Sequence, residues 1–453
     1  MIEKKSISVR ELALKTLDEI ESNGAYSNIA IERQKRKFSI AEKDNAFLHE
    51  LVYGVIKRKV SLDHIIFLHS KLKRSRISVS ILSILRMGVY QIVFLDKVPV
   101  SAAVNESVKL AKRYGNEGSI RFVNAVLRKI SRYKENQDKS WLPDPDKDPL
   151  KYLSVLYSYP EWICERWTTR YGREFAETLL DAGNWKPDFT IRTNKLRISR
   201  EALIDKLSEE GFSAQPGKYA PEAVVIDNPG DFTKSASFLD GLFTVQDESS
   251  MMSVLALEPK SGENILDVCC APGGKCSYIA EYSADQADIL ACDVFAHKLQ
   301  LVEQNNLRLG LKSVRLALQD ALEPDESLKN SMDRVLVDAP CSGLGIIRKK
   351  PEIKWTKSVS DIKNIAAMQL QILNNVAQYL KKDGILVYSV CTTEPEEGEQ
   401  VIEKFLENNP DFSRTLLPKE LPVGGSQFEM RLFPNIHGID GFYIAKLRKR
   451  NAN

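Results

Sequence analysis

The stretch LDVCCAPGGKCSYIAEY, residues 266–282, combines an apolar run, a turn with two glycines and a helical pattern. The apolar run predicts a buried strand, and the helix expected from about Lys275 directs its positive N-terminal end at the turn. Gly273 and Gly274 let the backbone of that turn approach a ligand closely. This order predicts the first strand–helix unit of a doubly wound α/β fold, with a ligand at the carboxyl end of the strand.

The same alternation continues from about residue 241 to residue 453. Short apolar runs suited to strands buried on both faces are separated by helical stretches; these runs are DILACDV, SVRLAL, DRVLVDAP and ILVYSVC. The run GFYIAKLRK (441–449) predicts a last strand. We therefore expect residues 241–453 to form a catalytic domain with a Rossmann-like, parallel, doubly wound sheet.

The predicted ligand is a nucleoside cofactor. Asp293 ends the second strand about 20 residues after the first, where a carboxylate accepts hydrogen bonds from ribose hydroxyls. The turn APGGKC lacks the G-x-G-x-x-G that a pyrophosphate requires, which favours S-adenosylmethionine because it carries no phosphate. Asp320, after the third strand, is placed to meet the adenine edge. A tight turn beside an incidental aspartate is the structural alternative. The predicted cofactor-binding residues are Cys269, Cys270, Ala271, Pro272, Gly273, Gly274, Lys275, Asp293, Asp320 and Asp338.

Two cysteines follow two further strands. Cys341 comes after Asp338 and Pro340 at the end of the fourth strand, and Cys391 ends the fifth. Because the carboxyl ends of neighbouring parallel strands face one crevice, both thiols and Asp338 are expected to meet beside the cofactor. Either cysteine alone is more often an inert buried residue. As a pair, with Asp-Ala-Pro before one of them, they favour catalysis by Cys391, Cys341 and Asp338.

A thiol beside a sulfonium methyl donor suits methylation of cytosine at C5. That carbon is too weak a nucleophile to take the methyl group directly. A thiolate that adds to C6 breaks the aromaticity of the ring and makes C5 nucleophilic. A carboxyl group at N3 and the exocyclic amine stabilises the developing charge, and a second thiol can assist when the first one leaves.

The first 135 residues differ from the rest in charge and in pattern. They hold 26 Lys and Arg against 14 Asp and Glu, a net +12, whereas the remaining 318 residues hold 38 against 47, a net −9. Helical spacing runs throughout, from a capping-box pattern at Ser8 and Glu11 to an almost wholly apolar central helix at 78–95. A basic helical bundle over 1–135 favours a polyanion such as RNA, although solvated surface lysines explain the charge equally well.

Between the two lie a proline-rich segment and an aromatic-rich one. Residues 136–150 hold three prolines and four aspartates with little to bury, which predicts a linker. Residues 151–240 read as a small α+β subdomain, with strands at FTIRTN and AVVID around a helix at 200–211. Its aromatic residues are more typical of a core than of a base-stacking surface.

Seven cysteines without a C-x-x-C pair, and no apolar segment suited to a signal or a membrane span, predict reduced thiols in the cytoplasm and no metal site. No membrane partner is expected, and the chain is expected to be a monomer.

Three motifs carry a resemblance to a known family. CCAPGGK (269–275), DAPCSGLGIIRKKPEIKW (338–355) and YSVCTTEPEEGE (388–399) resemble the signature regions of the NOL1/NOP2/Sun family of RNA cytosine-C5 methyltransferases. Residues 1–135 are similar to NusB, a helical RNA-binding domain. The resemblance spans nearly the whole chain and is weakest over 136–240. Val-Cys-Thr stands where many relatives have Thr-Cys-Ser, but the cysteine is retained.

The resemblance implies a role for each residue. The cysteine matching Cys391 is the nucleophile in that family, the cysteine matching Cys341 promotes product release, and the aspartate matching Asp338 holds the target base. The APGGK loop and the aspartates matching Asp293 and Asp320 bind S-adenosylmethionine. The implied substrate is a cytosine of 16S ribosomal RNA, and RKKPEIKW (348–355) is expected to grip RNA together with the basic bundle.

Three alternatives stay open. A DNA cytosine methyltransferase uses the same chemistry but has one such cysteine and no NusB-like part. Another RNA, either tRNA or a different rRNA site, is a second alternative. An RNA-binding assembly factor without turnover is the third, although it would be expected to lose Cys391, Asp338 or the loop glycines, and all are present.

Overall fold

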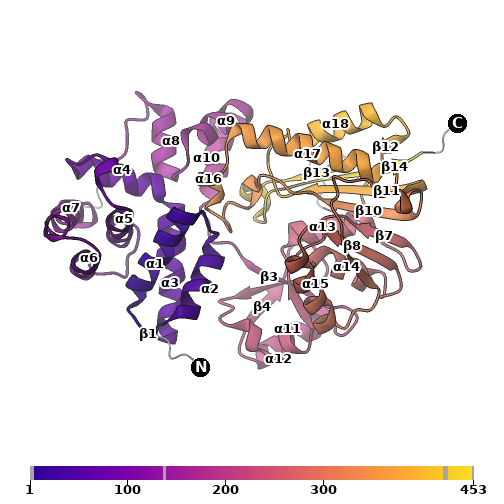
Figure 1. The fold of residues 1–453 in the computed structure, drawn as a ribbon, viewed down its shortest axis with the longest axis horizontal. Helices are drawn as coiled ribbons and strands as arrows, with labels where there is room; N and C mark the ends of the chain where they lie inside the picture. Colours follow the sequence, from indigo (N-terminus) through magenta and orange to yellow (C-terminus); the bar gives the residue numbers. More distant parts are fainter. Residues whose placement is uncertain (1–4, 136–138, 422–426, 451–453) are drawn as a thin grey trace. The chain divides into compact units, whose positions relative to one another are not determined.

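The computed structural model describes residues 5–135, 139–421 and 427–450, which form two compact units (Figure 1). The first unit comprises the described residues up to Trp185 together with Ile347–Thr356. The second comprises Lys186–Ile346 and the described residues from Lys357 onward.

The first unit is helical, as the sequence predicts. Its core surrounds α5 (Val79–Val93), whose side chains are buried on nearly all sides. Arg86 is buried within it because its guanidinium pairs with Asp63, at 2.7 Å from Nε to Oδ1. The other helices are α1 (Val9–Asn23), α2 (Ser27–Lys37), α3 (Asn45–Lys57), α4 (Lys59–His69), α6 (Val100–Tyr114), α7 (Glu117–Glu135), α8 (Pro149–Tyr157), α9 (Glu161–Tyr171), α10 (Arg173–Ala182) and α16 (Ile353–Thr356), with short strands β1 (Lys5–Ser6) and β2 (Phe38–Ser39).

The capping box predicted at α1 forms only in part. Ser8 Oγ accepts from Glu11 N at 3.2 Å, as expected of an N-cap serine. The Glu11 carboxylate instead accepts from Arg113 Nη1 at 2.5 Å and Tyr114 Oη at 2.6 Å. A longer-range ion pair therefore replaces the second half of the box.

Two observations concern the segment after α7. Trp141, within the predicted linker, is buried in the core of the first unit, and His64 Nε2 lies 2.8 Å from its carbonyl oxygen. Residues 136–138 of that segment lie outside the described residues. Helices α8–α10 group with the first unit instead of with the α+β segment of 151–240. The exact domain limits stay a prediction.

Most of the segment Ile347–Thr356 is buried in the first unit although Lys350 is exposed, so its predicted role in gripping RNA is corrected for two of its cations. Arg348 is 4% exposed and Lys354 is 1% exposed. Lys354 Nζ donates to the carbonyl oxygens of Lys57 and Ser158, both at 2.8 Å. Burial, with the nearby charges of Arg58 and Lys57, lowers the pKa of Lys354 well below its usual value. These two side chains are structural anchors, because neither is accessible to a phosphate.

Glu352, in the same segment, stabilises the start of α2. Its carboxylate accepts from the backbone N–H and the hydroxyl of Ser27, both at 3.0 Å, and both residues are buried. Tyr26, at the N-cap position, makes no side-chain cap of its own. A carboxylate more than 300 residues away in sequence therefore caps this helix.

Glu352→Ala is expected to lower the free energy of unfolding of the first unit by about 2 kcal/mol, because two buried donors lose their acceptor. Urea unfolding followed by tryptophan fluorescence reports on this unit, since every tryptophan of the chain lies in it. The matched control, Glu42→Ala, removes an exposed carboxylate and should change stability by less than about 0.5 kcal/mol. Equal stability of the two variants would contradict the capping role.

The second unit begins with the predicted α+β subdomain. A four-stranded antiparallel sheet has the order β4-β5-β3-β6. Helix α11 packs on this sheet through the buried side chains of Leu203 and Leu207. The elements are β3 (Phe189–Thr193), α11 (Arg200–Glu209), β4 (Ser213–Pro216), β5 (Ala223–Asp227), α12 (Ala236–Leu239) and β6 (Phe243–Val245).

The larger sheet of this unit confirms the predicted strand–helix alternation. Its strands run in the order β12-β14-β11-β10-β7-β8-β9, and β11, β10, β7, β8 and β9 are parallel. The parallel strands and their helices are α13 (Glu248–Leu257), β7 (Asn264–Asp267), α14 (Gly274–Tyr282), β8 (Asp288–Asp293), α15 (Ala296–Leu309), β9 (Val314–Leu318), β10 (Met332–Asp338), α17 (Val359–Ala377), β11 (Leu380–Val390) and α18 (Glu399–Asn408).

Helices cover both faces of this sheet (Figure 1). Leu336 faces a cluster that includes α13 and α14, whereas its neighbours Val335 and Val337 face α17 and α18. Alternate residues of one strand are therefore buried on opposite faces, which explains why the strands read as continuous apolar runs.

The prediction of a wholly parallel sheet is wrong at one edge. Strand β14 (Phe442–Lys449) is antiparallel to β11, β12 (Phe412–Arg414) and β13 (Glu429–Leu432). Between β13 and β14 the chain holds only the short helix α19 (Pro434–His437). A parallel crossover needs a dozen or more residues, so β13 and β14 form an antiparallel hairpin instead.

Candidate active site

The two predicted catalytic cysteines lie together at the carboxyl ends of neighbouring strands. Strands β10 and β11 pair in parallel, with Asp338 opposite Ser389. Cys341 and Cys391 follow these two strand ends, and their sulfur atoms are 3.0 Å apart. Both side chains are half-buried. The parallel topology brings together two thiols that are 50 residues apart in sequence.

The surroundings distinguish the two thiols. The contact with Cys391 raises the pKa of Cys341 well above its usual value, and burial and the negative charges of Glu397 and Asp338 raise it further. Cys341 therefore stays protonated and can donate its S–H to the sulfur of Cys391. With Cys341 as the donor, Cys391 is the acceptor of the pair, which suits a nucleophilic sulfur.

Asp338 is held at both carboxylate oxygens. Lys275 Nζ donates to Oδ2 at 2.6 Å, and Ser389 Oγ donates to Oδ1 at 2.9 Å. The Asp338 side chain is still 29% exposed, so a ligand can reach it. The ion pair joins the first turn of α14 to the end of β10, the strand that precedes Cys341.

The predicted loop turns sharply into α14. Gly273 has φ of 101°, in the left-handed region, and it stands at the N-cap position of the helix. A Cβ atom there would lie 2.9 Å from Val302 Cγ1, so a larger residue would be strained and crowded. The side chain of Cys270 packs into an apolar cluster with Cys276 and Val302. Cys270 is therefore expected to serve a ligand through its backbone alone.

The other predicted aspartates follow the next two strands. Asp293 ends β8 and is 8% exposed, with Oδ1 accepting from Phe295 N at 3.0 Å. Asp320 follows β9, is exposed, and accepts from Leu322 N at 2.9 Å. Both carboxylates are ordered by a backbone donor two residues ahead, which fixes their direction beside the strand ends.

The acidic residues that follow Cys391 do not directly open a helix. Helix α18 starts at Glu399, and residues 395–398 form a turn. The N-terminal end of α18 therefore does not directly follow Cys391. A buried carboxylate, that of Glu397, fills the space after Cys391 instead.

Family models match this architecture. Residues 254–448 match the model of the 16S rRNA methyltransferase RsmB/F, residues 7–132 match the NusB family, and residues 159–233 match a ferredoxin-like domain of RsmF/B-like methyltransferases. The probable ribosomal RNA small subunit methyltransferase B of Bacillus subtilis is 37% identical over 98% of this chain and 100% of its own length.

The chain belongs to the RsmB/F family of 16S rRNA methyltransferases.

Two solved structures are similar to this RsmB/F chain. The structure of PH0851 has a TM-score of 0.83 at 26% identity, over 99% of this chain and 100% of that one. The structure of NSun6 from Pyrococcus horikoshii with SFG has a TM-score of 0.60 at 25% identity, over 66% of this chain and 100% of that one. With the family models, they confirm the predicted order of a NusB-like part, an α+β part and a methyltransferase domain.

Sequence reasoning missed Asp267, which ends β7 in this RsmB/F chain. The residue is fully buried, and neither carboxylate oxygen has a hydrogen-bond partner among the described residues. Burial raises the pKa of Asp267 to about 7, and the negative charge of Asp338 adds to the rise. A carboxylate left unpaired in a protein interior is costly, which indicates that a ligand supplies the missing donors. The only sequence signal was its position at the end of the first strand.

Sequence reasoning also missed Arg192, on β3 of the α+β subdomain. It is fully buried and pairs with Glu281 of α14, at 2.7 Å from Nη2 to Oε1. Its Nη1 donates to the carbonyl oxygen of Gly274 at 2.6 Å. The subdomain therefore holds the glycine loop in place. The sequence could not show this pairing because its acceptors, Glu281 and the carbonyl oxygen of Gly274, belong to a distant segment of the chain.

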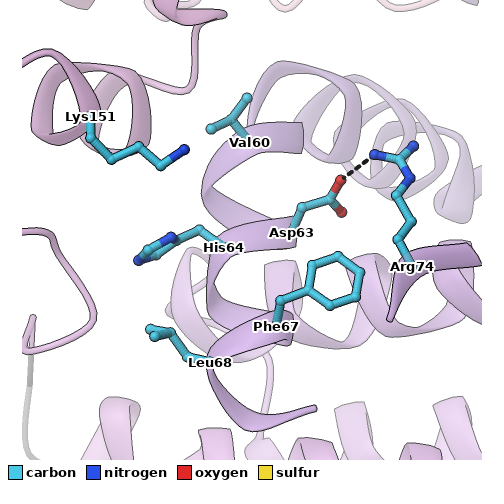
Figure 2. Close-up of a pocket in the computed structure, with 7 residues that line it drawn as sticks. All are labelled: Val60, Asp63, His64, Phe67, Leu68, Arg74 and Lys151. Carbon is cyan, nitrogen blue, oxygen red and sulfur yellow. Dashed lines mark hydrogen bonds and ion pairs between the residues drawn. The ribbon is translucent and has the colours of Figure 1, made fainter. Parts of the chain in front are cut away.

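A separate hollow lies in the first unit. Its volume is about 560 Å³, and Figure 2 shows Asp63 and Arg74 on one side of it, joined by an ion pair of 3.3 Å. The lining residues are Val60, Asp63, His64, Phe67, Leu68, Arg74 and Lys151. None of the predicted catalytic or cofactor-binding residues lines this hollow.

The described residues contain no cluster of His, Cys, Asp and Glu side chains that could hold a metal ion. Within the same ranges, no helix has the length and apolar character that crossing a membrane requires.

Proposed function

We propose that this chain transfers a methyl group from S-adenosylmethionine to C5 of one cytosine in 16S ribosomal RNA, through a covalent bond between Cys391 and C6. The observation that carries the proposal is the 3.0 Å contact between two strand-end thiols beside Asp338. Methyl transfer to oxygen or nitrogen needs no such pair. Methylation at a ring carbon needs one nucleophile to enter and a means for it to leave.

Cys391, Asp338 and Cys341 have different proposed roles. The thiol of Cys391 loses its proton to solvent water, and its sulfur bonds to C6 as the electron pair of the C5–C6 double bond moves to C5. The carboxylate of Asp338 accepts from the exocyclic amine and orients the base. Bound S-adenosylmethionine supplies an electrophilic methyl group on a sulfonium. After transfer, solvent water accepts the proton of C5, and the bond between C6 and sulfur breaks with its electron pair returning to the Cys391 sulfur. Cys341, whose raised pKa keeps it protonated, donates its S–H to the departing sulfur of Cys391.

The residues at the strand ends fit S-adenosylmethionine. The unpaired oxygens of Asp267 suit the cationic groups of this molecule, and Asp293 suits its ribose hydroxyls. Asp320 is proposed to accept from the adenine amine, and the backbone of residues 271–274 to form the turn next to the cofactor. The related NSun6 structure holds SFG, an analogue of S-adenosylmethionine, which supports this choice.

Asp267→Asn is expected to weaken binding of S-adenosylmethionine by roughly 10–100-fold at pH 8, the scale of a lost charged hydrogen bond. The folded pKa of about 7 lies above the unfolded value, so ionisation of Asp267 costs stability as pH rises through 7. A cationic ligand offsets that cost. The affinity of the parent chain for S-adenosylmethionine should therefore increase as pH rises through 7, whereas that of Asp267→Asn should not. Calorimetric titration between pH 6 and 8.5 measures both effects.

The control for this titration is Asp205→Asn, which changes an exposed carboxylate of α11. It should leave both the affinity and its pH dependence unaltered. Parental affinity with the same pH slope in Asp267→Asn would contradict the assignment.

The first unit offers the basic surface for RNA. On α7, Val123, Leu127 and Ile130 are buried, whereas Arg121 and Arg128 are exposed on the other side of the helix. The residues of KLKRSR (71–76) are exposed throughout. These cations and the exposed Lys350, without the buried Arg348 and Lys354, are the proposed phosphate contacts, so RNA binding should weaken with rising salt.

Methyl transfer from a labelled donor tests the proposed function. The substrates are protein-free 16S rRNA, assembled small subunits, tRNA and duplex DNA, and the product nucleoside is identified by mass spectrometry. The proposal expects 5-methylcytidine at one site of 16S rRNA. Labelling of tRNA or DNA in its place, or RNA binding without any turnover, would overturn it.

A further inference from the structure

Glu397 is buried between the two cysteine-bearing loops. Its side chain is fully inaccessible, in the turn between β11 and α18. Ser342 N donates to Oε1 at 2.7 Å, and Ser342 Oγ donates to Oε2 at 2.5 Å. Thr392 Oγ1 donates to Oε2 at 3.0 Å, and Gln369 Nε2 lies 3.4 Å from Oε1. Four donors from three residues therefore meet one carboxylate.

The donors come from both cysteine loops. Ser342 directly follows Cys341, and Thr392 directly follows Cys391. The hydroxyls of Ser342 and Thr392 are also 3.0 Å from each other. Each cysteine is therefore one residue away from a group bonded to the same carboxylate.

Two further bonds involve Glu397 and its partner Gln369. Tyr388 Oη, on β11, donates to the Glu397 carbonyl oxygen at 2.6 Å. Gln369, on α17, uses the same Nε2 to donate to the carbonyl oxygen of Pro340 at 2.8 Å. The backbone of Glu397 is thus bonded to β11, and Gln369 links α17 to both the Glu397 carboxylate and the loop of Cys341.

The backbones of the two cysteine-bearing loops are in direct contact. Gly345 N donates to the carbonyl oxygen of Cys391 at 3.1 Å. A Cβ atom on Gly345 would lie 3.0 Å from the same carbonyl oxygen and 2.0 Å from that of Gly441, which precedes β14. The loops therefore touch without intervening side chains, and the distance between the sulfur atoms depends on how each loop is held.

We infer that Glu397 is a positioning residue that sets the contact between Cys341 and Cys391 by binding both loops at once. The inference rests on the proposed function for its catalytic meaning and extends it to a residue that touches neither the base nor the methyl donor. The bond to Thr392 orients Cys391 for attack on C6. The two bonds to Ser342 orient Cys341 for the step in which Cys391 leaves.

Glu397→Gln keeps the shape of the side chain but places an NH₂ group against hydrogen-bond donors. We expect the rate of methyl transfer at saturating RNA to fall about 100-fold, the scale of an active-site displacement near 1 Å. The affinity for S-adenosylmethionine should change less than about threefold. Glu403→Gln, on the exposed face of α18, is the matched control and should keep the parental rate.

Two single-arm variants separate positioning from general loss of structure. Ser342→Ala should slow release, so that a covalent RNA adduct accumulates. Thr392→Val should slow formation of the adduct, so that little accumulates although the overall rate also falls. Quenched single-turnover reactions on denaturing gels measure the two steps. Parental rates in Glu397→Gln, or a defect at the same step in both single-arm variants, would overturn the inference.

A measurement without RNA keeps this test distinct from that of the proposed function. Diamide, a thiol oxidant, should join Cys341 to Cys391 quickly in the parent chain and at least about tenfold more slowly in Glu397→Gln, because the displaced sulfurs seldom meet. Peptide mapping by mass spectrometry follows the disulfide. Equal rates in the two chains would overturn the inference even if no RNA is methylated. A slower rate beside an inactive parent would overturn only the proposed function.

Discussion

Cys391→Ala is expected to abolish methyl transfer to RNA, with a loss of about 10⁴-fold or more, the scale seen when a covalent nucleophile is removed. The reason is chemical, because C5 of cytosine stays unreactive until a nucleophile has added to C6. Incorporation of a labelled methyl group into 16S rRNA measures the rate. Binding of S-adenosylmethionine should be unaltered, since Cys391 is absent from the proposed cofactor residues.

The control for that experiment is Cys164→Ala. Cys164 is a buried thiol of the first unit, and burial raises its pKa to about 12. The Cys164→Ala variant should retain full activity, which would show that the loss of methyl transfer is specific to the strand-end thiol. Measurable turnover by Cys391→Ala would rule out the covalent mechanism.

Cys341→Ala is expected to trap the covalent intermediate. Removal of the thiol that lies 3.0 Å from the Cys391 sulfur leaves addition possible but takes away the group that assists departure. RNA and protein should then migrate together on a denaturing gel, and the fraction of trapped chain should exceed that of the parent by at least about tenfold.

The double variant Cys341→Ala/Cys391→Ala controls for nonspecific crosslinking and should show no trapped complex. If the single variant turns over at the parental rate without accumulating a complex, then Cys341 has no part in release.

The sequence predicted much of the second unit because its signals are local. Apolar runs mark strands that are buried on both faces, and the motifs that follow those strands must lie at one edge of a parallel sheet. That reasoning predicts that Asp338, Cys341 and Cys391 lie together. It failed at β14, since periodicity shows that a strand exists but not the direction in which the chain returns.

Elsewhere, contacts between residues far apart in the chain limit what the sequence can predict. Lys354 lies in a basic stretch that resembles a surface for RNA, yet the carbonyl oxygens of Lys57 and Ser158 hold it inside the first unit. Trp141 lies in a segment rich in proline and aspartate, yet it is buried. In both cases the stabilising contacts come from residues far along the chain, which spacing within the segment cannot reveal.

The buried carboxylates illustrate the same limit within the site. The oxygens of Asp267 lack donors among the described residues, and four donors surround the carboxylate of Glu397. Both environments arise when three or more segments converge. The sequence marks the cysteines as chemically unusual but cannot mark the carboxylates that position or complete their surroundings.

The central claim is that the sulfur of Cys391 bonds to C6 of a cytosine in RNA. The most direct test digests the RNA complex of Cys341→Ala with protease and nuclease and locates the nucleotide on the protein by mass spectrometry. We predict a methylated cytidine attached to the peptide that contains Cys391. Attachment to any other residue, or turnover with no attached nucleotide on any peptide, would contradict the account.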